Sequence, residues 1–143
     1  MKISIITITY NSEKTLRDTI ESVLSQSYKD IEYIIVDGKS KDSTCEIIQS
    51  YGDRVATFVS EKDNGLYDAL NKGIGLATGD VVGFLHSDDI FASTETIKMI
   101  AEAFIKFKVD SVYGDLVFKT KVNIDSNLIV GTDKLTISFW SVS

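Results

Sequence analysis

Residues 3–9 read ISIITIT, a run of β-branched residues interrupted by a single serine. Such a run, almost wholly apolar and far too short to cross a bilayer, is typical of a buried strand in a parallel sheet. Asn11 and Ser12 follow it and are favourable helix N-caps. Apolar residues at helical spacing come next, so the sequence predicts an amphipathic helix over residues 13–26.

The same alternation of strand and helix patterns continues along the chain. Further strands are predicted at Glu32–Val36, Val55–Val59, Val81–Leu85 and Ser111–Phe118, with Val122–Val130 as an antiparallel partner. Further helices are predicted over residues 43–51 with a Ser43–Glu46 capping box, over residues 66–77 with Leu66, Ala69, Leu70 and Ile74 inward, and after Ser93. Strand–helix repetition with short loops predicts one α/β domain over residues 1–143, with a mostly parallel sheet and helices on both faces.

Composition and missing motifs exclude several classes of protein. The chain has 143 residues and a net charge of −6, with no dense run of Lys or Arg, so nucleic acid is not an expected partner. One cysteine, Cys45, and one histidine, His86, exclude a disulfide framework and a zinc site. The dinucleotide, P-loop and hydrolase-elbow motifs are absent. No transmembrane segment is predicted, so we expect a cytoplasmic protein, or one peripheral to the inner face of the membrane.

Polar residues follow three of the predicted strands at the points where those strands end. They are Thr9, Tyr10 and Asn11 after the first strand, Asp37 and Gly38 after the second, and Asp88 and Asp89 after the fourth. In parallel sheets, ligands bind beyond the carboxyl ends of the strands. The sequence therefore predicts that these three groups share one rim of the sheet.

Each acidic group on this rim has two interpretations. Asp88 and Asp89 could form a solvated turn, or they could hold Mg²⁺ or Mn²⁺, because adjacent carboxylates repel each other unless a cation intervenes. Asp37 could cap its own loop, or it could accept a hydrogen bond from a nucleobase or ribose. Tyr10 could pack in the core or stack on a nucleobase.

Five blocks of sequence, taken in order, resemble one protein family. They are ISIITITYN at 3–11, SVLSQSY at 22–28, IIVDGKSKDST at 34–44, EKDNGLYDALNKG at 61–73, and ATGD at 77–80 followed by FLHSDD at 84–89. This order and spacing resembles the family 2 glycosyltransferases, in a bacterial branch linked to polysaccharide biosynthesis. The resemblance implies a GT-A, Rossmann-like fold. It also implies transfer of a sugar, with inversion, from a nucleotide-sugar donor, by default UDP-linked, to a glycan or lipid-linked glycan acceptor.

The resemblance also assigns roles to the residues on the rim. Thr9 and Tyr10 would hold the nucleobase, with Asn11 beside them. Asp37 would bond the base or the ribose, and Asp88 would reach the ribose or the water shell of the metal. Asp89 would ligate Mn²⁺ or Mg²⁺ beneath the diphosphate. Many members carry an arginine where Leu70 stands, and Lys72 is either a substitute phosphate contact or a solvated lysine.

An inverting transfer needs a general base, which in the family lies well downstream of the acidic pair. Asp115 is the first candidate, but we expect the base and most of the acceptor-binding part to be missing from this chain. Phe139, Trp140 and Val142 would then be exposed or covered by a second copy, which predicts a homo-oligomer. A module that binds a nucleotide sugar without efficient transfer is the alternative function.

Overall fold

The computed structural model describes residues 1–115 and 136–141. The strands are β1 (Ile3–Thr9), β2 (Ile31–Asp37), β3 (Thr57–Ser60), β4 (Val81–Phe84), β5 (Ser111–Asp115) and β6 (Thr136–Ser141). The helices are α1 (Leu16–Leu24), α2 (Thr44–Gln49), the short 3-10 helix η1 (Gly52–Arg54), α3 (Leu66–Leu76) and α4 (Thr96–Phe107). All the elements predicted within residues 1–115 are present, with ends shifted by a few residues.

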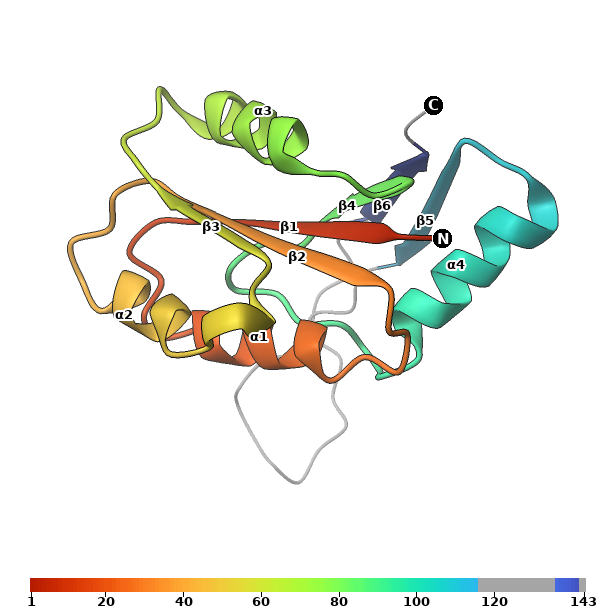
Figure 1. Cartoon of the computed structure of the whole chain (residues 1–143), viewed down its shortest axis with the longest axis horizontal. Coiled ribbons are helices and arrows are strands. Elements are labelled where there is room, and N and C mark those ends of the chain that lie inside the picture. The colour runs from red at the N-terminus through yellow and green to blue at the C-terminus, as the bar shows by residue number, and fades with distance from the viewer. Residues whose placement is uncertain (116–135, 142–143) are drawn as a thin grey trace.

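The strands form one sheet in the order β3-β2-β1-β4-β6-β5. β1 pairs in parallel with β2 on one side and with β4 on the other, and β3 pairs in parallel with β2. The register places Thr9 beside Asp37, and Asp37 beside Ser60. The carboxyl ends of the first three strands therefore lie at one rim, around which the loops after β1 and β2 curl at the left of Figure 1.

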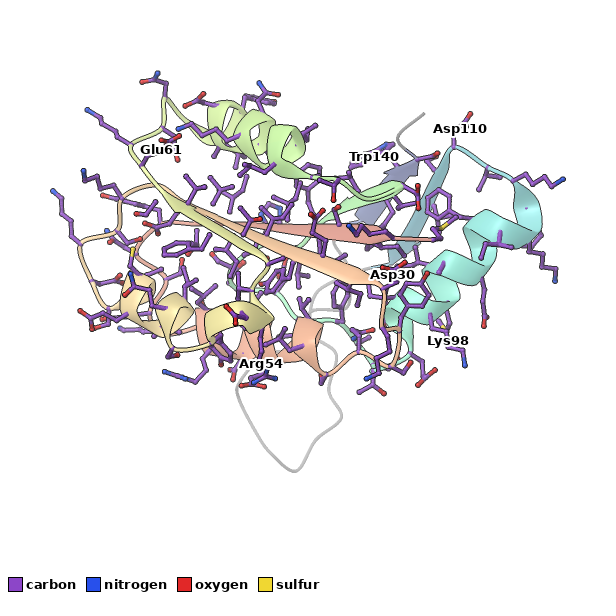
Figure 2. All side chains as sticks on the ribbon, in the orientation of Figure 1. Asp30, Arg54, Glu61, Lys98, Asp110 and Trp140 are labelled. Atoms are coloured by element: carbon purple, nitrogen blue, oxygen red, sulfur yellow. The ribbon has the colours of Figure 1, made fainter. Side chains whose placement is uncertain are left out.

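Helices cover both faces of the sheet, as predicted. α3 lies on one face, and α1, α2 and α4 lie on the other (Figure 1). Ile3 and Ile5 of β1 belong to the larger core, on the side of α1, whereas Ile6 belongs to the smaller core under α3. Side chains fill the space between the sheet and both helical layers (Figure 2). The two-residue alternation of a strand thus lets β1 contribute to both cores.

The inward face of α3 differs from the prediction. Leu66 and Ile74 were expected to point inward but are 52% and 49% exposed, whereas Ala69 is buried. A Cβ atom at Gly73 would lie 2.5 Å from Cγ2 of Ile6, so the helix approaches β1 through its small residues. This close approach is what moves the larger side chains to the flanks of the helix.

The antiparallel part of the sheet also differs from the prediction. β6 inserts between β4 and β5 and is antiparallel to both. Phe139, expected at the surface, is 1% exposed, and its ring occupies the space where a Cβ atom at Gly83 would stand. Trp140 remains 47% exposed, in edge contact with Phe84. The predicted strand Val122–Val130, the end of Ser111–Phe118, and Val142 lie outside the described residues.

Candidate functional site

Hydrogen bonds join the loop after β1 to the loop after β2. The backbone N–H of Gly38 donates to the carbonyl of Thr9 at 2.9 Å. The N–H of Asn11 donates to Oγ of Ser40, and Oδ1 of Asn11 accepts from the N–H of Lys41, both at 2.8 Å. Asn11 has a positive φ of 47°, which turns the chain at this point. Its side-chain oxygen therefore serves the joint between the two loops.

A second set of bonds extends this joint to the start of α2. The N–H of Ser12 donates to Oγ1 of Thr44 at 2.8 Å, and the N–H of Ser43 donates to Oε2 of Glu13 at 3.0 Å. The Ser43 side chain makes no cap bond, so the predicted capping box is wrong. Asp42 takes this role instead, because its carboxylate accepts from the N–H and the hydroxyl of Thr44.

Asp37 is wholly buried, and protein groups surround its carboxylate. Oδ1 accepts from the hydroxyl of Ser40 at 2.5 Å, and Oδ2 accepts from the N–H of Ser40 at 2.9 Å and the hydroxyl of Ser60 at 2.7 Å. The thiol of Cys45 also donates to Oδ2, at 3.2 Å. Burial by itself raises the pKa of Asp37, but these hydrogen bonds hold that pKa below its usual range. A contact with a ligand stays a prediction and would have to displace one of these donors.

Thr9 and Tyr10 lie differently although they are adjacent. Thr9 is 2% exposed, and its Oγ1 has no hydrogen-bond partner among the described residues. Tyr10, by contrast, is 57% exposed. Stacking of a nucleobase on Tyr10 stays a prediction with which this exposure agrees.

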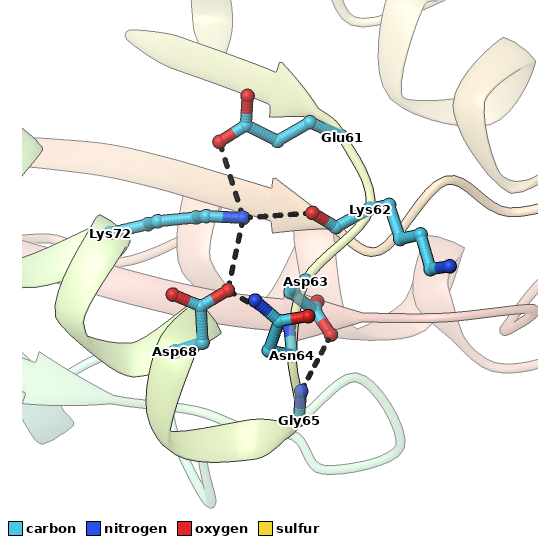
Figure 3. Close-up of polar contacts among 7 residues, drawn as sticks. All are labelled: Glu61, Lys62, Asp63, Asn64, Gly65, Asp68 and Lys72. Carbon is cyan, nitrogen blue, oxygen red and sulfur yellow. Dashed lines mark hydrogen bonds and ion pairs between the residues drawn. The ribbon is translucent and has the colours of Figure 1, made fainter.

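The loop of residues 61–65 joins this rim from β3. The N–H of Glu61 donates to the carbonyl of Asp37 at 3.0 Å, which continues the β2–β3 pairing. Lys72 of α3 then holds the loop, because its Nζ lies 3.2 Å from Glu61, 3.4 Å from Asp68 and 3.2 Å from the carbonyl of Lys62 (Figure 3). Lys72 is therefore a structural cation in this network, a role that neither interpretation of the sequence foresaw.

The same loop carries Asp63, which lies in the block 61–73 and to which the sequence analysis assigned no role. Its Oδ1 accepts from the N–H of Gly65 at 3.3 Å. A Cβ atom at Gly38 would lie 2.9 Å from Oδ2 of Asp63 and 3.5 Å from Cδ2 of Tyr10. Gly38 thus leaves room for an exposed ring and a carboxylate oxygen to face each other. The sequence signal that could have predicted this contact is that Asp37-Gly38 follows one strand of the sheet and Asp63 follows the next.

Asp88 and Asp89 follow β4 on the other side of β1. Within residues 1–115 and 136–141, neither carboxylate accepts a hydrogen bond or forms an ion pair, although the N–H of Asp89 donates to the carbonyl of His86 at 3.0 Å. Burial raises the pKa of Asp89, and the charge of Asp88 raises it further, against a lowering by His86. The two carboxylates are thus held near each other with their oxygens free.

A cleft of about 450 Å³ joins the three loops of the rim. Its lining includes Asn11, Asp42 and Asp88, one residue from each loop, together with His86. Tyr10, Asp37 and Asp89 do not line this cleft. The structure therefore brings the predicted loops together, while the predicted residues are divided between the cleft and the surface near Gly38.

The fit of a divalent cation depends on Asp88 and Asp89. Among the described residues, no three His, Cys, Asp or Glu side chains gather as a metal site. Mg²⁺ and Mn²⁺ at phosphate-transfer sites commonly take one or two carboxylates and complete their shell with water and substrate oxygens. Asp88 lines the open cleft and Asp89 is its neighbour in the chain. Two adjacent carboxylates that accept no hydrogen bond from the described residues fit this mode of binding and do not fit an all-protein cage.

Asp115, the candidate base, is the last residue of β5 and pairs with Thr136. β5 runs parallel to β4 but is separated from it by β6, so Asp115 lies at the rim end of the sheet, two strands from β4. Leu70, at the position for which the resemblance implies arginine in many members, lines a small pocket with Ile8 and Phe84. No helix among the described residues is long and apolar enough to cross a bilayer.

Comparison with known proteins identifies the family. A model described as glycosyl transferase family 2 matches residues 4–129, so the chain belongs to glycosyl transferase family 2. It is 39% identical over 102 residues to an uncharacterized glycosyltransferase of Mycobacterium tuberculosis. The aligned region covers 71% of this chain and 39% of that protein. The chain thus spans less than half the length of this relative. The family suggested by the sequence blocks is confirmed.

Solved structures agree with this assignment. The fold matches S. aureus TarS 1-349 in complex with UDP-GlcNAc, with a TM-score of 0.72 and 29% identity, over 78% of this chain and 33% of that one. It also matches a mannosyltransferase from Pyrobaculum calidifontis in complex with GDP-Man and Mn²⁺, with a TM-score of 0.70 and 22% identity, over 77% of this chain and 34% of that one. The predicted GT-A fold is confirmed.

Proposed function

We propose that residues 1–143 bind the nucleotide-sugar donor of a metal-dependent, inverting glycosyltransferase. The observation that carries the proposal is the rim itself. Hydrogen bonds fix the loops after β1, β2 and β4. Oδ2 of Asp63 and the carboxylates of Asp88 and Asp89 nevertheless accept no hydrogen bond from residues 1–115 and 136–141, and Tyr10 is exposed. Groups held in place but unsatisfied are the expected form of a preorganised binding site.

The nucleobase is proposed to bind near Gly38. One face of the base would stack on Tyr10, and the oxygen of Asp63 would accept a hydrogen bond from a base N–H. Asp37 would shape this place through Ser40 and Ser60. The bound UDP-GlcNAc in TarS supports a nucleotide-sugar ligand, and UDP is the first nucleotide to test.

The diphosphate is proposed to lie toward Asp88 and Asp89. This acidic rim would repel it, so a divalent cation, Mn²⁺ or Mg²⁺, is proposed to bind Asp89 between carboxylate and phosphate. When bound, the cation would neutralise charge on the leaving diphosphate. The Mn²⁺ and GDP-Man in the mannosyltransferase of the same fold agree with this choice.

Transfer itself is proposed to require a base that takes the proton of an acceptor hydroxyl. Asp115 is the proposed candidate in this chain, and a glycan or lipid-linked glycan of bacterial polysaccharide synthesis is the proposed acceptor. A module that binds the donor without transferring the sugar is the second candidate function, because Asp115 lies on β5, which β6 separates from β4 and the acidic pair that follows it. The half-exposed Trp140 is a proposed contact of a homo-oligomer.

A thermal-shift screen tests donor binding directly. UDP, GDP, dTDP and CDP sugars would be added to the 143-residue chain with and without Mn²⁺. We expect one donor to raise the melting temperature more with Mn²⁺, and Asp89→Ala to abolish that additional shift. Asp53→Ala removes an exposed carboxylate from η1, which precedes the amino end of β3, and serves as the matched control. A metal-dependent shift that survives Asp89→Ala would contradict the metal assignment. Incubation of the chain with the bound donor and candidate acceptors is a separate experiment, which distinguishes transfer from binding alone.

A further inference from the structure

A stripe of polar side chains, on α1 and on the residues that flank it at both ends, contacts the segment that carries the two acidic residues. The stripe consists of Ser12, Thr15, Thr19, Ser22 and Gln26, spaced alternately by three and four residues. This spacing places them on one side of a helix. Thr19 and Gln26 are 0% and 3% exposed, so the side of the helix on which they lie faces the protein.

Each member of the stripe bonds the segment between β4 and α4. The hydroxyl of Ser12 lies 3.0 Å from that of Ser87, Thr15 donates to the carbonyl of Ser87 at 2.8 Å, and Thr19 donates to the carbonyl of Asp89 at 2.7 Å. Oγ of Ser22 accepts from the N–H of Phe91 at 3.3 Å. The backbone groups that they bond thus belong to every second residue of the segment, namely Ser87, Asp89 and Phe91.

Gln26 completes the series at the start of α4. Its Nε2 donates to the carbonyl of Ser93 at 2.7 Å, and its Oε1 accepts from the N–H of Ile97 at 3.0 Å. The eleven steps from Thr15 to Gln26 would rise by about 16 Å in a continuous helix, and the six steps from Ser87 to Ser93 can span at most about 20 Å. The two repeats therefore match closely enough for the segment to follow the helix along its length.

These bonds hold the segment without using its acids. The partners of the stripe are backbone groups and one serine hydroxyl, so the carboxylate oxygens of Asp88 and Asp89 remain available. Two adjacent carboxylates repel each other and would separate on an unrestrained loop. A hydroxyl on the carbonyl of Ser87 and another on that of Asp89 bracket the pair and oppose this separation.

We propose that the polar stripe on α1 is a positioning device for the acidic pair, with Thr19 as its central residue. This inference rests on the proposed function, because it assumes that the pair faces a cation and a diphosphate. Removal of the Thr19 hydroxyl should release the carbonyl of Asp89 and weaken the metal-dependent part of nucleotide binding. The contact of the nucleobase near Gly38 should be unaffected.

Two substitutions of Thr19 separate positioning from packing. Thr19→Val keeps the shape and loses the hydroxyl, whereas Thr19→Ser keeps the hydroxyl and loses a buried methyl group. Calorimetric titration of UDP into the 143-residue chain, with and without Mn²⁺, measures the gain in affinity that the metal provides. We expect Thr19→Val to reduce this gain about tenfold, as loss of an outer-shell partner does, and Thr19→Ser to keep it despite a lower melting temperature. Ser25→Ala, exposed at the end of α1, is the matched control.

A lower melting temperature for Thr19→Val with an unchanged gain from Mn²⁺ would overturn the proposal and leave the stripe a purely structural role. If Thr19→Val does not fold, Thr15→Val enters the same titration with the same expectation.

If the unmodified chain shows no gain from Mn²⁺, the proposed metal function fails, and amide hydrogen exchange decides the inference separately. Faster exchange at Asp89 and Phe91 in Thr19→Val, but not in Thr19→Ser, supports positioning. Unchanged exchange at both amides overturns it.

Discussion

Asp37 and the Asp88–Asp89 pair stand at strand ends on opposite sides of β1, and their surroundings differ in kind. Asp37 is buried and accepts from Ser40, Ser60 and Cys45, whereas the carboxylates of the pair accept from none of the described residues. At the pair, α1 holds the backbone instead of the side chains. The acceptor sites of a carboxylate that organises a loop are occupied by protein donors. A carboxylate whose backbone is held instead keeps its oxygens for a ligand.

The largest effect is expected from Asp37→Ala. Removal of this buried carboxylate would leave several part-buried donors without an acceptor, so we expect the free energy of unfolding to fall by about 3 kcal/mol. Urea denaturation measures it. A loss below about 1 kcal/mol would show that the loops do not depend on Asp37 and would remove the contrast with the pair.

Lowering the pH should reveal the same dependence of stability on Asp37, because protonation neutralises the carboxylate without removing the side chain. The folded pKa of Asp37 is lowered, so its contribution is complete above its unfolded pKa of about 3.9 and is lost as the pH falls through the lower folded value. We expect the difference in stability between the unmodified chain and Asp37→Asn to be constant from pH 7 to about pH 5 and to shrink below about pH 4. A difference that grows on acidification would have the wrong sign.

Lys72→Met should have a moderate effect on binding. The substitution keeps most of the side-chain volume but removes the cation between Glu61 and Asp68, which frees the loop that carries Asp63. We expect nucleotide affinity to fall about two- to fivefold, measured by titration without metal. Lys98→Met removes a comparable ion pair with Glu95 on α4 and should leave the affinity unchanged.

The smallest effect on stability is expected at the pair. Because neither carboxylate bonds the described protein, Asp88→Asn and Asp89→Asn should each change the free energy of unfolding by less than about 0.5 kcal/mol. Urea denaturation beside Asp37→Ala makes the contrast quantitative. Destabilisation by more than about 1 kcal/mol would mean that the pair also supports the fold.

The sequence predicted the parallel core because its signals are local. The run at residues 3–9 is buried wherever it packs, and the strand-end rule placed Asp37, Asp88 and Asp89 on one rim. β6 was missed because a short strand can pair with any free edge, and only the close approach of Phe139 to Gly83 selects β4. The inward face of α3 was misassigned because apolar size favoured Leu66 and Ile74, whereas close packing favours Ala69 and Gly73.

The candidate site was predictable in its position but not in its contacts. Asp63 resembled an ordinary turn residue until the strand order brought it to Gly38. Cys45 entered the sequence analysis only as evidence against a disulfide framework and a zinc site, and the structure shows its thiol donating to Asp37. The stripe on α1 did leave a signal, the spacing of Thr15, Thr19, Ser22 and Gln26, but its partner was a segment about seventy residues away.

The insertion of β6 beside β4 has a consequence for how the protein is made. More than fifty residues separate Phe84 from Thr136, so a ribosome working at about 5–20 residues per second leaves one edge of β4 unpaired for several seconds. An open, apolar strand edge in a nascent chain can pair with another chain. Yield during synthesis should therefore depend on temperature and chaperone supply more than the stability of the finished sheet would indicate.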